Sequence, residues 1–133
     1  MTSKLATVIL AGLVITGCGQ TDQQPTKSIK VRSAEQDQLK QLDALNLAIA
    51  LKRAIYAAGY TCKRVTDAGF VGEWKNLDMW EAHCEYDRSA PVDWAIFAGP
   101  DGGAQVRICN DLAGSGLPAC AIKQRPKGSF NST

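Results

Sequence analysis

The stretch DWAIFAGPDGGAQVRIC, residues 93–109, decides the fold class. Its first part alternates, so that Trp94, Ile96 and Ala98 share one face of a strand. Residues 99–103 read Gly-Pro-Asp-Gly-Gly, which is typical of a tight turn. Alternation then resumes, with Val106 and Ile108 on the inward face. The stretch therefore predicts two antiparallel strands, Asp93–Ala98 and Ala104–Cys109, joined by a short turn.

Two further strands are expected upstream. The run MWEAHCEY, residues 79–86, alternates between an apolar and a polar side, and Tyr60–Thr66 is rich in β-branched and aromatic residues. Consecutive strands with short connections favour an antiparallel meander of three to four strands over crossover connections.

A helix is expected before the sheet. Ser33 and Gln36 have the spacing of a capping box, and Gly59 can supply the left-handed stop. The interval predicts one long N-terminal helix packed on the sheet, which gives an α+β domain of two layers. Apolar residues spread over a wide arc of its second half, so contact with a loop, with a partner or with a second copy of the chain stays open.

The segment between the first two expected strands, Asp67–Asp78, is predicted as an apolar loop. It carries Phe70 and Trp74 among glycines. Such a loop either folds back over the sheet or meets a partner, and in the second case Phe70 and Trp74 are the candidate interaction residues.

Composition excludes several classes of protein. The chain has 133 residues, 45% of them hydrophobic, and a net charge of +2. That length fits one small domain. The charge is too small for a nucleic-acid binder, and the apolar fraction is too high for general disorder. No nucleic acid is therefore expected as a partner.

The N-terminus has the pattern of an export signal. Lys4 precedes an apolar run, Leu5–Ile15, which is too short to span a bilayer. The run ends in Ile15-Thr16-Gly17-Cys18, which resembles the lipobox of bacterial lipoproteins. The resemblance covers only these first 18 residues. An ordinary cleaved signal, or an uncleaved anchor, is the alternative.

The resemblance implies a signal peptide over residues 1–17 that is removed after a diacylglycerol is joined to the Cys18 thiol. Two or three acyl chains on Cys18 would anchor the protein stably to a membrane. In this class an Asp after the cysteine favours retention at the inner membrane. Because Gly19 stands at that position, the resemblance implies that the protein is anchored in the outer membrane and faces the periplasm, in a host with two membranes. Residues 18–32 are polar and are expected to form a tether.

The cysteine count fits an exported protein. Without Cys18, the five cysteines leave four, Cys62, Cys84, Cys109 and Cys120. Four cysteines in an exported domain suggest two disulfides, for which three pairings exist. We favour Cys62–Cys84, between neighbouring strands, and Cys109–Cys120, across a short Gly-rich loop. A thiolate metal site or a redox-active dithiol is disfavoured because no C-x-x-C pair occurs, and no cofactor or metal is expected.

The residue types needed for catalysis are sparse. The single histidine, His83, neighbours Cys84, but adjacent side chains of a strand point to opposite faces. Glu81, His83 and Glu85 share one face, although steps of about 7 Å are too wide for easy convergence on a metal. No catalytic residue is assigned, and the protein is not expected to be an enzyme.

These observations predict four parts of the chain: a signal peptide 1–17, a tether 18–32, a domain 33–122 and a mobile basic tail 123–133. The function expected is that of a lipid-anchored, non-enzymatic interaction or structural module of the cell envelope, with an envelope protein as its candidate partner. The alternatives are an inhibitor of a secreted hydrolase such as lysozyme and, less favoured, an envelope hydrolase.

Overall fold

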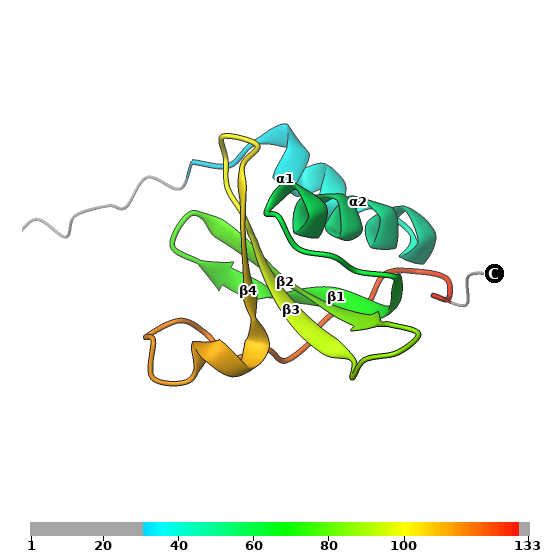
Figure 1. The fold of residues 1–133 in the computed structure, drawn as a ribbon. Helices are drawn as coiled ribbons and strands as arrows, with labels where there is room; N and C mark the ends of the chain where they lie inside the picture. Colours follow the sequence, from blue (N-terminus) through cyan, green and yellow to red (C-terminus); the bar gives the residue numbers. More distant parts are fainter. Residues whose placement is uncertain (1–30, 131–133) are drawn as a thin grey trace, which may run out of the picture.

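The computed structural model describes residues 31–130, which fold into two helices and one sheet (Figure 1). The elements are α1 (Ala34–Leu39), α2 (Ala44–Ala57), β1 (Arg64–Trp74), β2 (Leu77–Glu85), β3 (Val92–Ala98), β4 (Ala104–Ile108) and the short 3-10 helix η1 (Cys109–Leu112). The strands form one antiparallel sheet in the order β1-β2-β3-β4. The α+β class and the meander are therefore confirmed. The signal peptide, Cys18 and most of the tether lie outside the described residues.

The prediction of one long helix is wrong, because the helical region is divided into α1 and α2. Asp43 starts the second helix by accepting a hydrogen bond from the Asn46 backbone N at 2.9 Å. The Ala44 backbone N donates to the carbonyl of Lys127 at 2.8 Å, a contact from the far end of the chain. The expected capping box is present at α1, where Ser33 and Gln36 bond each other reciprocally. A local cap and a distant acceptor thus interrupt an otherwise helical sequence.

The prediction of a loop over Asp67–Asp78 is also wrong. β1 continues through it to Trp74 and begins at Arg64 rather than Tyr60, and β2 begins at Leu77. Lys75 takes a left-handed conformation (φ 56°) in the two-residue turn between the strands. The register of the β1–β2 pairing shifts twice, between Val65 and Asp67 and between Phe70 and Gly72, and the strand continues through both shifts.

Both faces of the sheet carry a core. On the helix side, Leu47, Leu51 and Ile55 of α2 pack with Trp80 and Ile96 of the sheet. On the opposite side, a smaller cluster joins the sheet to the loop around η1; its buried members are Val71, Met79, Ala95, Phe97 and Leu112. Figure 1 shows the helices on one side of the sheet and this loop on the other. The two expected layers are thus supplemented by a partial third one.

Residues 121–130 form a segment that we call the C-terminal strap. At its centre, the Phe70 backbone N donates to the carbonyl of Gln124 at 2.8 Å, which makes an isolated bridge to β1. Arg125 holds Asp67 through two hydrogen bonds of 3.1 and 2.8 Å. Phe130 packs against the helix-side core. Residues 123–130 are thus packed on the domain, unlike the tail expected from the sequence.

The strap requires a glycine where it crosses β1. A Cβ at Gly69 would lie 2.6 Å from the Gln124 carbonyl oxygen and would overlap the side chain of Ile122. Gly69 itself has no positive φ. Close approach of another segment, rather than backbone conformation, is therefore the reason for glycine at this position.

Candidate functional site

The four later cysteines form the two favoured disulfides. Cys62 and Cys84 are bonded with Cα atoms 5.5 Å apart, and Cys109 and Cys120 with Cα atoms 5.7 Å apart. Cys62 and Cys84 are fully buried in the helix-side core. All cysteines of the described residues are consequently tied in pairs.

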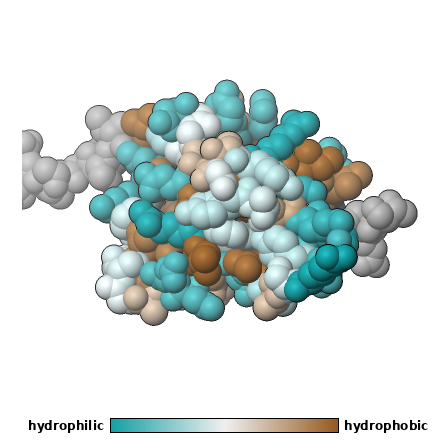
Figure 2. Space-filling model, in the orientation of Figure 1, coloured by the Kyte–Doolittle hydropathy of each residue, from teal (hydrophilic) through white to brown (hydrophobic). Residues whose placement is uncertain are grey.

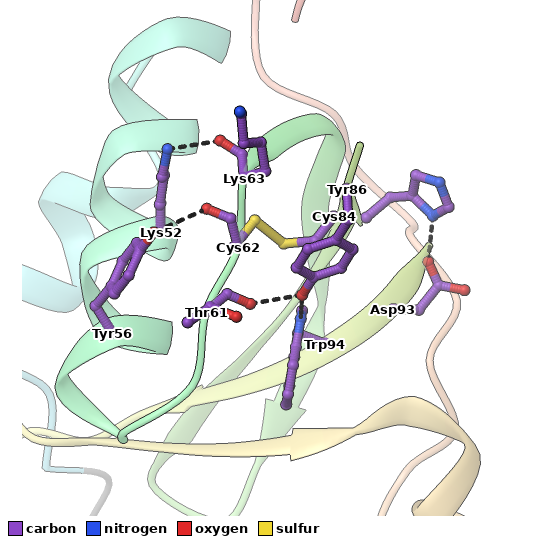
Figure 3. The surroundings of a disulfide bond; sticks show 10 residues. Lys52, Tyr56, Thr61, Cys62, Lys63, Cys84, Tyr86, Asp93 and Trp94 are labelled. Atoms are coloured by element: carbon purple, nitrogen blue, oxygen red, sulfur yellow. Dashed lines mark hydrogen bonds and ion pairs between the residues drawn. A yellow bond between two sulfur atoms is a disulfide. The ribbon is translucent and has the colours of Figure 1, made fainter. Parts of the chain in front are cut away.

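The Cys62–Cys84 disulfide lies beside residues 61–63, a segment that is held between α2 and the sheet by hydrogen bonds (Figure 3). Lys52 of α2 donates to the Lys63 carbonyl at 2.7 Å, and the Tyr56 hydroxyl donates to the Cys62 carbonyl at 3.3 Å. On the other side, the Tyr86 hydroxyl donates to the Thr61 carbonyl at 2.5 Å. Side chains of α2 and of Tyr86, which directly follows β2, thus satisfy the backbone carbonyls of an irregular segment.

Phe70 and Trp74, the candidate interaction residues, lie in the β1 strand and are half-buried. Phe70 packs against Trp80 on the helix side, with ring centroids 5.3 Å apart. Trp74 meets Phe97 of the opposite core, with centroids 6.4 Å apart. The two aromatic residues therefore face opposite sides of the sheet and do not form one surface.

A small cavity of about 20 Å³ lies between α1, the sheet and the strap. Phe70 and Trp80 line it on the sheet side, Lys40 on the helix side and Arg125 on the strap side. The buried Trp80 Nε1 has no hydrogen-bond partner among the described residues. The volume is about that of one water molecule, so the cavity is too small for a larger ligand.

A charged row crosses the sheet on the side opposite the helices. Cross-strand pairing places His83 between Asp67 of β1 and Asp93 of β3. His83 Nδ1 lies 2.5 Å from an Asp93 carboxylate oxygen, and both side chains are partly exposed. Within the row, the His83 imidazole thus contacts the Asp93 carboxylate directly, whereas the Asp67 carboxylate pairs with Arg125.

Glu81 lies two residues before His83 on the same face. Partial burial raises the pKa of Glu81, and the negative charges of Asp93 and Asp67 raise it further, whereas Arg125 and His83 oppose the shift. A carboxyl group that holds its proton more strongly beside an imidazole–carboxylate pair can serve in acid–base chemistry. Sequence reasoning missed this row because its members come from three strands.

The described residues contain no group of three or more His, Cys, Asp or Glu side chains arranged to hold a metal ion. Among the same residues, no helix combines the length and the apolar character needed to cross a bilayer.

A second feature missed from the sequence is a buried carboxylate. The Asp78 side chain is fully buried and accepts from Arg32 through both oxygens, at 2.9 and 2.8 Å. Lys40 lies 3.5 Å away. These cations compensate the buried charge and fix the place where the chain enters the domain.

The outer side of α2 carries exposed apolar side chains. Leu45, Ile49 and Tyr56 are 55%, 41% and 51% exposed, and they form what we call the α2 stripe. At 3.6 residues per turn the three lie within about 40° of one another, away from the buried Leu47 and Leu51. Figure 2 shows an apolar patch where Figure 1 places the N-terminal half of α2, amid a largely hydrophilic surface.

Comparison of the chain with protein-family models, with curated proteins and with solved structures finds no match.

Proposed function

We propose that the chain is a lipid-anchored protein of the bacterial cell envelope whose folded domain acts as a non-enzymatic interaction or structural module. The observation that carries the proposal is the pairing of cysteines. Four close into two disulfides within the domain, which leaves Cys18 as the fifth. Cys18 directly follows a short apolar run in a lipobox-like context, where its thiol is the group that lipoproteins acylate.

The exposed α2 stripe supports the interaction part of the proposal. The domain already has a core on each face of its sheet, and the stripe contributes to neither. Apolar side chains gathered on one exposed face are typical of an interaction surface. An envelope protein is the partner class proposed, and residence at the outer membrane follows from Gly19 if the host has two membranes.

The experiment is to express the full chain and the Cys18→Ser variant with and without globomycin, followed by intact-mass analysis. We expect acylated mature protein from the unaltered chain and precursor from either treatment. The Gly19→Asp variant is the matched control for destination, because it should be acylated but retained at the inner membrane. Unchanged processing after both treatments would contradict the lipoprotein proposal.

The His83–Asp93 pair with Glu81 favours a second candidate, an envelope hydrolase. Its test uses His83→Gln, which removes the imidazole from a partly exposed position and should leave the fold intact. Hydrolysis of purified peptidoglycan by the unaltered protein, lost in this variant, would favour the hydrolase. Protection of peptidoglycan from added lysozyme would instead favour the hydrolase-inhibitor alternative.

A further inference from the structure

We propose that the α2 stripe docks on the anionic lipid surface to which the chain is anchored, so that the domain lies against the bilayer in a defined orientation. The inference rests on the proposed lipid anchor at Cys18 but concerns a different part of the molecule. Its occupant is a bilayer that contains anionic headgroups.

Charge is the first argument. The α2 sequence ALNLAIALKRAIYA contains Lys52 and Arg53 and no carboxylate. Lys52 lies about 20° beyond one edge of the stripe and Arg53 about 40° beyond the other, so apolar and cationic groups share one side of the helix. Apolar side chains with adjacent Lys and Arg are the combination that binds an anionic membrane interface.

The surroundings extend the same chemistry beyond the helix. Tyr60, 44% exposed, follows α2, and its ring packs at a tilt against Trp94 with centroids 4.7 Å apart. Lys63 is held next to α2, since Lys52 donates to its carbonyl. Three carboxylates lie near α2: Asp43 caps it, Asp87 pairs with Lys63 and Arg64, and Glu35 of α1 lines a pocket with Ala50 and Ala54 on the side of α2 away from the stripe. Tyrosine rings prefer the headgroup level because they combine an apolar body with a polar tip.

The same charges disfavour a second copy of the chain as the occupant. Two α2 helices packed along their stripes, in either direction, would bring Lys52 and Arg53 of both copies within about one helical turn of each other. Like charges at that spacing repel, whereas an anionic surface neutralises them.

The tether is the third argument. Val31 is the first described residue, and it comes 13 positions after Cys18 in the sequence, a length of chain that can extend over at most about 45 Å. An anchored domain thus stays near the bilayer at all times. A low affinity of the α2 stripe for lipid is sufficient in this case, because docking of an anchored domain is an intramolecular step.

The test is hydroxyl-radical footprinting of the acylated mature protein in vesicles of phosphatidylcholine alone or mixed with anionic phosphatidylglycerol. We expect oxidation of Tyr56 and Ile49 to fall by more than half in the anionic vesicles, with no change in the 110–119 loop. Each basic residue near an anionic surface changes binding about fivefold. Arg53→Gln should therefore shift the docking equilibrium about fivefold towards the free domain.

Arg107→Gln is the matched control, because Arg107 is an exposed arginine on β4 and its loss changes the net charge equally. It should leave the protection unchanged. Equal oxidation of Tyr56 in both kinds of vesicle would overturn the proposal, as would an equal effect of the two arginine variants. Protection that depends on protein concentration would assign the stripe to self-association instead.

A separate arm distinguishes failure of the anchor from failure of docking. The full-length Cys18→Ser chain cannot be acylated but keeps the α2 stripe. With excess anionic vesicles, Tyr56 of this chain should still be protected from oxidation. Adding Arg53→Gln should raise the lipid concentration needed for half of this protection about fivefold. Lack of lipid on purified protein with this protection retained would refute the anchor alone, and lipid without protection would refute docking alone.

Discussion

Replacing Gly69 by alanine tests how the C-terminal strap is held on the sheet. The added Cβ would lie 2.6 Å from the Gln124 carbonyl oxygen and would overlap Ile122. Neither neighbour is the end of a long flexible side chain, so the strap itself has to move. Gly72→Ala is the matched control on the same strand, since its Cβ would meet only the Lys123 Nζ, at 3.9 Å.

The magnitude follows from the contacts that displacement would break. The strap bonds the Phe70 backbone N at 2.8 Å and the Phe70 carbonyl at 2.9 and 3.1 Å. Each such hydrogen bond contributes about 1 kcal/mol net, and overpacking costs about 1–3 kcal/mol. Loss of unfolded-state entropy offsets about 0.4–1 kcal/mol in either variant. We expect Gly69→Ala to destabilise by about 2 kcal/mol and Gly72→Ala to be neutral or slightly stabilising.

The assay is urea unfolding of the oxidised protein, followed by tryptophan fluorescence, together with limited trypsin digestion. Gly69→Ala should accelerate cleavage after Lys127, whose carbonyl is bonded to Ala44 when the strap is in place. Equal unfolding free energies for the two alanine variants, with equal rates of cleavage, would refute the reasoning.

Three further predictions concern stability and are checked by urea unfolding. Arg32→Gln should destabilise by about 3 kcal/mol, because the buried Asp78 carboxylate loses its bidentate partner; a change below 1 kcal/mol would show that the charge is compensated without it. Asp43→Ala should cost about 1 kcal/mol through loss of the α2 cap, and Asp43→Asn, which can still cap, should cost less. Glu81→Gln should stabilise the protein at neutral pH. Because the pKa of Glu81 is raised in the folded state, ionisation of Glu81 opposes folding once the pH rises above the ordinary glutamate range. The stability gained by the substitution should therefore vanish below that range. A gain independent of pH would refute this assignment.

Local patterns predicted the elements whose determinants are close in sequence. The Ser33–Gln36 capping box, the alternating strands and the turn at residues 99–103 all depend on residues a few positions apart. The break at Asp43 had a local signal, since an aspartate before an apolar run is a typical N-cap. That signal was hidden by the apolar residues on both sides, which suit one continuous helix.

The remaining features depend on contacts between distant segments. Asp78 is buried only because Arg32 reaches it, and Gly69 is needed only because the strap crosses β1. Neither contact is accompanied by a periodic pattern of residues in the sequence. The β1–β2 turn had a weak signal, the polar pair Lys75-Asn76 between the apolar Trp74 and Leu77, but the glycines of β1 suggested a loop. The charged row on His83 required the register of three strands.

The connectivity of the disulfides has a consequence for how the protein matures. Cys62 joins Cys84 and Cys109 joins Cys120, so among these four the first cysteine bonds the second and the third bonds the fourth. An oxidase that links thiols in the order in which they leave a translocation channel would produce both native bonds without later reshuffling. Cys18 would leave such a channel first, and as a free thiol it would pair with Cys62 and leave Cys84 to pair with Cys109. A lipid on Cys18 would remove this competitor, so that the proposed anchor would also protect the fidelity of oxidative folding.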